Sequence, residues 1–498
     1  EEWHQKLHNN TSPDDVVICE ALLKYIDAGL DISAYWGHLH KHNIDAQRLA
    51  SFDRAIRSEP RFSEGQVVGL KRDLTAYLDT LRAVHGGTDL ASAARNVVGY
   101  SAKGLKSSRE INVEPVPGVA TPELTLSLAA ALHLQRALSA PGGPPEGSPL
   151  PSGLAGSVRL MELLADARMA LRPAIEGGNA ACGGRLADVL FLDLALEAAQ
   201  RTALEGCLGA TRALAQDVVA RQQRMAALDK PGRSPTPAPA SVAVPTVEGA
   251  TAKLRLLLQV ACLALEGAVL SATPNDELLA ALKWLANVRT MDAGSVTVRE
   301  RAMQALAGVE RTKRAVTEQA GALVAALVPT AQALAPRLHL DPQHPGVAQL
   351  AEEVVRGTSC APLSQVLGVL EPCLRQLTGA GEWQVVARGT QAERGGAVGV
   401  VRVLDALEAV QFDTFQEPTV LVVDTIHGHE EVPSGCVAVL SAAGQCPDML
   451  AHSAVRARNM DVTLAACHSQ QVGKSLRDMA GLKVKVTLSG QDIKVVVV

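Results

Sequence analysis

Aromatic residues are scarce in this chain, which has only five Phe, four Tyr and four Trp among 498 residues. A core built mainly from aromatic rings is therefore excluded, although 47% of the residues are hydrophobic. Most of the hydrophobic residues are aliphatic, and Ala and Leu are good helix formers. Together with 20% charged residues, this composition predicts a soluble protein whose helices pack through aliphatic side chains. Its length predicts roughly two to four domains.

A strong charge of either sign is also missing, because 47 Lys and Arg against 52 Asp and Glu leave a formal net charge of −5. No basic patch interleaved with aromatic residues is present, so we expect neither a nucleic-acid partner nor a membrane partner. Apolar runs are short, and that at 186–196 is interrupted by Asp188 and Asp193. We therefore expect no membrane-spanning segment. Since the chain begins at Glu1, we expect a fragment without its targeting segment.

The nine cysteines include no CxxC pair and no zinc-type spacing, which is typical of a reducing compartment. Histidines make no convincing metal site either. His4 and His8 are four residues apart on a predicted helix, but the zincin glutamate and a third ligand are missing, which favours helix packing. The alternating His38, His40 and His42 predict a solvated turn. We expect no metal ligands in this chain.

Most of the chain has the three- and four-residue apolar spacing of amphipathic helices, as in a helical bundle. The clearest stretches are 160–171, 185–208, 252–270, 276–289, 296–334 and 347–356. Two segments rich in Pro, Gly, Ser and Ala, near 139–153 and 229–246, predict linkers. We expect a helical domain over 1–110, a helical region over 111–380 and a separate domain over 381–498.

The last of these domains is rich in short β-branched runs separated by Gly, Pro, Asp and Ser, which predict strands. The runs lie at 419–424, 436–441, 462–467, 483–488 and 494–498. The predicted fold class is therefore α+β, with a mostly α-helical, bundle-like region followed by a small C-terminal β/α domain.

One motif in this domain suggests chemistry: His452 is followed by Arg456, Arg458 and Asn459. The pattern predicts a helix that begins at His452, where unpaired N–H groups and the helix dipole favour an anion. A neutral imidazole is a nucleophile, and guanidinium groups match phosphate oxygens. The motif therefore predicts a histidine that carries a phosphoryl group. Taken alone, it also fits a buried structural histidine beside solvated arginines. Since the arginines are two residues apart, we expect only one to contact phosphate directly.

Several segments in sequence order resemble the alpha-glucan, water dikinase family, which phosphorylates starch. They include the WHQKLHNN signature at 3–10, and they lie at 2–19, 51–60, 190–196, 381–386, 430–433 and 447–459. The resemblance covers nearly the whole chain, and it identifies the C-terminal domain as similar to a swivelling phosphohistidine domain.

This resemblance implies a transfer in which the β-phosphate of ATP passes to His452 and the γ-phosphate passes to water. The phosphohistidine then phosphorylates a glucosyl hydroxyl of starch or another alpha-glucan. His452 is the catalytic residue implied, whereas phosphate binding by Arg456 and Arg458 is inferred from their chemistry. ATP and Mg²⁺ would be bound by an ATP-binding domain that is absent from this chain, so the fragment should be inactive alone. The family implies the chloroplast stroma, and a homodimer is left open.

Two departures from the family pattern affect these expectations. Ala451 stands where a hydroxyl residue is usual, which could slow transfer by removing a partner of the imidazole or phosphate. Thr463 and Cys467 stand where plant relatives tend to have two cysteines, so a local redox switch is not supported. The alternatives are a phosphoglucan, water dikinase and a non-catalytic helical scaffold with an inactive carrier domain.

Overall fold

The computed structural model describes residues 13–42, 44–46, 49, 59–85, 90–103, 110–139, 149–228, 247–271, 275–292, 296–339, 341–444 and 446–498. The WHQKLHNN signature, the predicted linker at 229–246 and most of that near 139–153 lie outside the described residues. The chain divides into two compact units, 1–152 with 159–203 and 153–158 with 204–498. The domain boundaries expected near 110 and 380 stay predictions.

The first unit is helical and contains two hydrophobic cores. One surrounds Tyr35 and Leu39, and the other surrounds Leu164 and Leu192. A two-stranded antiparallel sheet also belongs to this unit. The elements are α2 (Pro13–Asp27), α3 (Ile32–Lys41), η1 (Glu64–Gln66), α5 (Val67–His85), α6 (Leu90–Val98), β1 (Tyr100–Lys103), β2 (Glu110–Val113), α7 (Pro122–Ser139), most of α8 (Gly153–Ala181) and the start of α9 (Leu186–Leu228).

The solvated turn predicted around His38 is wrong. Helix α3 continues to Lys41, and His38 is buried on it, with 8% of its surface exposed. Its ring nitrogens lie 3.1 Å from the Glu20 carboxylate and 2.8 Å from Lys24 Nζ. Burial lowers the pKa of His38 below its usual value. The alternating histidines predicted a turn, but the segment continues as a helix that buries Tyr35, His38 and Leu39.

The helical part of the second unit contains the remainder of α9 and five further helices among the described residues. They are α10 (Val247–Ser271), α11 (Asp276–Thr290), α12 (Val298–Leu334), α13 (Pro345–Arg356) and α14 (Cys360–Thr378), with a 3₁₀ turn, η2 (Ala335–Leu338). Asn275 caps α11, and Thr297 with Glu300 forms a capping box at the start of α12. The six predicted helical stretches are confirmed.

We expected no segment that could span a membrane, but part of helix α10 has the length and composition to do so. Among the described residues, the stretch 249–271 is long and apolar enough to do so by length and composition. Its most apolar window is 61% buried inside the protein. This is weak support for a membrane span, because a buried core helix passes the same test.

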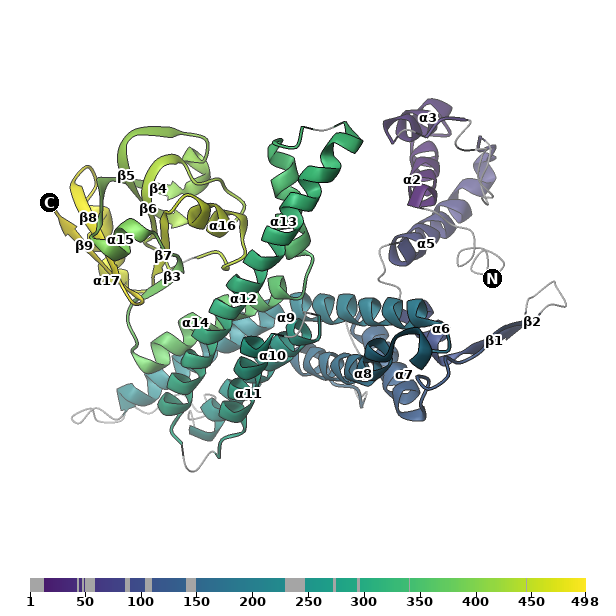
Figure 1. Ribbon diagram of the computed structural model, residues 1–498, viewed down its shortest axis with the longest axis horizontal. Helices are drawn as coiled ribbons and strands as arrows, with labels where there is room; N and C mark the ends of the chain where they lie inside the picture. Colours follow the sequence, from purple (N-terminus) through teal and green to yellow (C-terminus); the bar gives the residue numbers. More distant parts are fainter. Residues whose placement is uncertain are drawn as a thin grey trace. The chain divides into compact units, whose positions relative to one another are not determined.

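The C-terminal part of the second unit is a seven-stranded mixed sheet with the order β3-β7-β6-β5-β4-β8-β9 (Figure 1). Strands β4 to β7 are parallel to one another, and β3, β8 and β9 join the sheet in antiparallel fashion. The strands are β3 (Trp383–Ala387), β4 (Ala397–Ala406), β5 (Thr414–Thr425), β6 (Ser434–Ser441), β7 (Thr463–Cys467), β8 (Lys483–Ser489) and β9 (Asp492–Val497). The five predicted strands and the α+β class are confirmed; β3 and β4 are additional.

Side chains alternate along each strand, so the sheet presents apolar side chains on both faces, and one helix packs on each face. Helix α16 (His452–Asn459) buries Ala454 and Ala457 against one face, which includes Leu464. Helix α17 (Gln470–Asp478) buries Leu476 against the other. The short elements α15 (Thr390–Arg394) and η3 (Leu407–Val410) complete the domain. Because α16 connects the parallel strands β6 and β7, its first residue lies at the edge where β6 ends.

A buried ionic cluster joins this sheet to helices α12 and α14 within the same unit. Glu371 on α14 is fully buried and accepts hydrogen bonds from Lys313 Nζ at 2.6 Å and Arg375 Nε at 3.0 Å. Gln384 on β3 also donates to Glu371, at 3.4 Å, and Lys313 donates to the carbonyl of Val385 at 3.3 Å. The first strand of the C-terminal sheet is therefore held against the helices by charged hydrogen bonds.

Candidate active site

His452 is the first residue of α16, as predicted, and Ala451 is the N-cap residue. Alanine has no side-chain oxygen to cap the helix, and no side-chain hydrogen bond is formed at this end. The backbone N–H of Ser453 instead donates to the carbonyl of Gly428 at 3.0 Å. One N–H group expected to face an anion is therefore already engaged by the loop that leads to Glu430.

The imidazole of His452 lies between two carboxylates. Its Nε2 is 2.7 Å from Oε1 of Glu431, and its Nδ1 is 3.5 Å from Oε2 of Glu352. Glu431 belongs to the loop before β6, whereas Glu352 lies on α13. The His452 side chain is 15% exposed, so the ring is held in place yet still reaches solvent. Both ring nitrogens therefore have an acidic partner that can fix their orientation.

Arg456 lies one helical turn after His452, on the same face of α16. Its Nε is 3.2 Å from Oε2 of Glu431 and 3.5 Å from Nε2 of His452. The Glu431 carboxylate thus bridges the imidazole and the guanidinium. An anion held by a histidine nitrogen and an arginine would need this same position.

Arg458 is placed differently from Arg456. Burial lowers the pKa of its guanidinium, and the negative charge of Asp448 opposes this shift. Within the described residues its side chain makes no hydrogen bond to His452. Of the predicted site residues, the structure brings His452 and Arg456 together and leaves Arg458 outside their contact.

The adjacent acids Glu430 and Glu431 have different environments and do not form a carboxylate pair. Glu430 is fully buried and accepts hydrogen bonds of 2.6 Å from the backbone N–H groups of His427 and Gly428. Glu430 therefore fixes the loop at Gly428, whose carbonyl accepts a hydrogen bond from Ser453 N–H at the start of α16. Glu431 contacts both His452 and Arg456 but was not among the predicted site residues, although it lies in the segment 430–433 that resembles the family.

The turn before His452 is fixed by Asp448. Its Oδ1 accepts a hydrogen bond of 2.6 Å from Ser364 on α14 and one of 2.9 Å from the backbone N–H of Leu450. This carboxylate therefore connects the segment that precedes the histidine to the helical part of the same unit.

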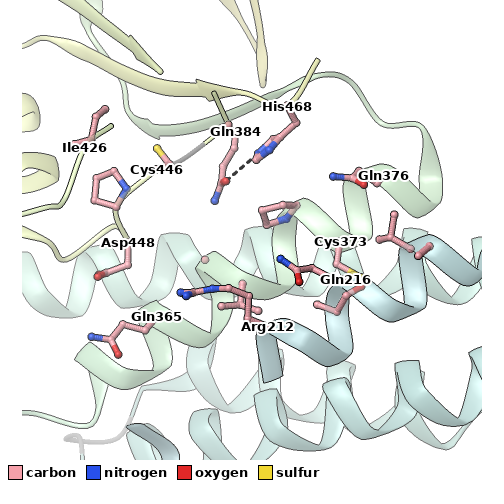
Figure 2. A pocket seen from close by; sticks show the side chains of 18 of the residues that line it. Arg212, Gln216, Gln365, Cys373, Gln376, Gln384, Ile426, Cys446, Asp448 and His468 are labelled. Atoms are coloured by element: carbon pink, nitrogen blue, oxygen red, sulfur yellow. Dashed lines mark hydrogen bonds between the residues drawn. The ribbon is translucent and has the colours of Figure 1, made fainter. Parts of the chain in front are cut away.

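A cavity of about 760 Å³ lies beside this turn, within the second unit. Figure 2 shows helices on one side of it and the segments that contain Ile426, Cys446 and Asp448 on the other. His468 and Gln384 meet across its rim through a hydrogen bond of 3.2 Å. Burial lowers the pKa of His468, which favours the neutral ring.

Comparison with known proteins adds to this geometry. A family model described as alpha-glucan water dikinase, phosphohistidine-like domain, matches residues 382–498. The chain is also 34% identical, over 99% of its length, to the chloroplastic alpha-glucan water dikinase of Citrus reticulata. The chain is related to the alpha-glucan water dikinases. Both the predicted resemblance and a C-terminal phosphohistidine-like domain are thus confirmed.

Two further alpha-glucan water dikinases support this relationship. The chloroplastic protein of Solanum tuberosum is 34% identical over 97% of the chain, and alpha-glucan water dikinase 2 of Arabidopsis thaliana is 33% identical over 98%. The chain covers 28% of the Citrus and Solanum dikinases and 32% of the Arabidopsis one, so it spans about a third or less of their length. No solved structure matches the chain.

Proposed function

We propose that the C-terminal domain is the phosphoryl carrier of an alpha-glucan, water dikinase. In this proposal His452 takes the β-phosphate of ATP, the γ-phosphate passes to water, and the carrier phosphorylates a glucosyl hydroxyl of starch or a similar glucan. The observation that carries it is the position of Glu431, whose carboxylate contacts both Nε2 of His452 and Nε of Arg456. That arrangement offers one anion position with a nucleophile on one side and a guanidinium on the other.

We assign the phosphoryl group to Nε2, because Nε of Arg456 lies 3.5 Å from this nitrogen and can reach a phosphoryl group bound there. Glu431 is in place to accept the Nε2 proton, which frees the lone pair for attack on phosphorus. As the N–P bond forms, the bond between the β-phosphorus and the oxygen that bridges it to the α-phosphate breaks, and AMP leaves with that electron pair. The phosphoryl oxygens then replace the carboxylate beside Arg456. When a glucosyl hydroxyl attacks, the N–P bond breaks, its electron pair returns to Nε2, and Nε2 takes up a proton as the hydroxyl loses its own.

Glu352 has a positioning role in this proposal. Its carboxylate faces Nδ1 at 3.5 Å and orients the ring so that Nε2 points away from α13. Arg456 makes the direct phosphate contact. Arg458 supplies a second positive charge on the same helix, and its partial burial keeps that charge less screened by solvent.

ATP would be supplied by an ATP-binding domain that acts together with this chain. Magnesium would accompany ATP, but the described residues contain no group of three or more His, Cys, Asp or Glu able to hold a metal ion. No step is therefore assigned to Mg²⁺ on this chain. Since the Citrus and Solanum relatives are named chloroplastic, we propose the chloroplast stroma as the location. A homodimer is left open.

The proposal is tested by mixing the chain with a separately expressed ATP-binding domain of the family and β-labelled ATP. We expect an acid-labile label on the wild type that can be chased onto soluble glucan, and no label on His452→Ala. His429→Ala is the matched control, because His429 is an exposed histidine of the same domain that stacks on His427 instead of meeting Arg456. If the wild type stayed unlabelled while the same ATP-binding domain labelled another carrier, the proposal would be wrong and the chain would be a scaffold with an inactive carrier domain.

A further inference from the structure

The cavity near α16, the helix that begins with the carrier residue His452, has a polar lining that no step of the proposed transfer uses. Five glutamines contribute to it: Gln216 and Gln223 from α9, Gln365 and Gln376 from α14, and Gln384 from β3. Gln384 is hydrogen-bonded to Glu371 and His468, whereas the side-chain amides of the other four make no hydrogen bond to any other described residue. Each amide offers two donor hydrogens and an acceptor oxygen. The walls therefore present unused hydrogen-bonding groups of both kinds around one space.

The charge of the lining restricts what this space can hold. Arg212 is its one cationic side chain that is always charged, and Asp448 is its one carboxylate. Asp448 already accepts from Ser364 and from Leu450 N–H, so it is occupied structurally. A site for a nucleotide needs several cations or a glycine-rich loop, and a metal site needs several acidic or imidazole ligands. The lining fits a neutral ligand rich in hydroxyl groups, since a hydroxyl both donates and accepts.

We propose that this cavity binds a stretch of alpha-glucan chain and so presents the acceptor next to the carrier histidine. The inference rests on the proposed function, which makes a glucan the acceptor. At about 760 Å³ the space lies within the usual range for ligand pockets of about 300–1,000 Å³. Figure 2 shows Arg212, Gln216 and Gln365 on the helices facing the segment that carries Asp448 and Cys446.

The wall of the cavity is packed directly against the start of the carrier helix. His427 and Pro447 line the cavity, and Gly428 follows His427. A Cβ built on Gly428 would lie 3.1 Å from Cβ of Ala451 and 3.2 Å from Cβ of Pro447. The carbonyl of Gly428 also accepts the Ser453 N–H. The segments that line the cavity and the residues on either side of His452 therefore form one packed cluster of loops.

The test is isothermal titration of the 498-residue chain with maltoheptaose, without ATP or any other domain. Gln216→Ala/Gln365→Ala removes two amides from the helical wall of the cavity and leaves His452 and its partners unchanged. Since the variant removes the hydrogen bonds of two amides, we expect it to bind maltoheptaose about tenfold more weakly than wild type. Gln391→Ala/Gln416→Ala, two exposed glutamines outside the cavity, is the matched control and should bind like wild type.

Three results would overturn the inference: no binding by wild type, unchanged binding by the cavity variant, or equal weakening by the control. None of them affects the carrier proposal, because phosphorylation of His452 is measured separately and needs no glucan. Conversely, maltoheptaose binding that depends on Gln216 and Gln365 would stand even if His452 accepted no phosphate. The two proposals therefore fail independently.

Discussion

The buried acid Glu371 should be among the most sensitive positions in the second unit, because three donors converge on its carboxylate. Glu371→Ala would leave Lys313, which is 15% exposed, with only the Val385 carbonyl at 3.3 Å as a described hydrogen-bond partner. Arg375, which is 4% exposed, would lose one partner but keep Glu310 and the Ala380 carbonyl, each at 2.9 Å.

Removing one partner of a buried ion pair costs about 3–5 kcal/mol. Because Arg375 keeps two acceptors, we expect the lower end, a loss of about 3 kcal/mol in the free energy of unfolding of this unit. Glu371→Gln keeps an acceptor oxygen in the same place and should lose less, about 1–3 kcal/mol.

Urea unfolding followed by tryptophan fluorescence measures this loss, because Trp383 on β3 is 4% exposed and adjoins Gln384. Glu382→Ala is the control, since Glu382 is an exposed acid in the same region and should change the unfolding free energy by less than about 0.5 kcal/mol. A loss below about 1 kcal/mol for Glu371→Ala would refute the reasoning, because it would mean that water replaces the carboxylate without penalty.

Three other outcomes are expected. Glu431→Gln should slow loading of the carrier histidine with phosphate by about 100-fold, since an amide cannot take the Nε2 proton; an unchanged single-turnover rate would contradict this. Burial lowers the pKa of His468 below the usual histidine value of about 6.5, so the unfolded chain binds a proton that the folded chain excludes. The contribution of His468 to the free energy of unfolding should therefore be complete above about pH 6.5 and be lost as the pH falls towards the pKa of the folded state. In urea titrations, His468→Gln should make the free energy of unfolding less dependent on pH in this range. Gly435→Ala should lower the free energy of unfolding by at least about 2–3 kcal/mol in urea titrations, because φ of Gly435 is +81° and a Cβ would lie 2.2 Å from the Phe415 carbonyl oxygen. Gly481→Ala is the control: φ of Gly481 is +76° but no atom lies near its added Cβ, so the loss should be about 1 kcal/mol.

The strands that were predicted are those in which most residues are β-branched or alternate with polar residues between turn residues, such as β5 and β8. Strand β4 was missed although it contains several valines, because Gly399 interrupts its pattern. The glycine is required by packing: a Cβ there would lie 2.8 Å from the carbonyl oxygen of Pro418 on the neighbouring strand. Helix α14 was also missed; it contains Pro372 and buries most of its side chains, including Leu363, Leu367 and Leu374.

The candidate site shows the same division between local and long-range information. The spacing of His452 and Arg456 is local, and a helix places both side chains on one face. Glu431 precedes His452 by 21 residues, and Glu352 lies on a separate helix. No spacing rule connects either acid to the histidine, because only the packing of the β6 loop and of α13 brings them together. The family resemblance pointed to the segment of Glu431 without indicating its role.

The most direct measurement is to identify the phosphorylated atom in the loaded chain. After loading by the separate ATP-binding domain, the protein would be examined by ³¹P NMR at alkaline pH and by mass spectrometry of its peptides. We expect a single phosphoryl group on Nε2 of His452, beside Arg456. Phosphate on another residue, or on Nδ1, which faces Glu352, would contradict it.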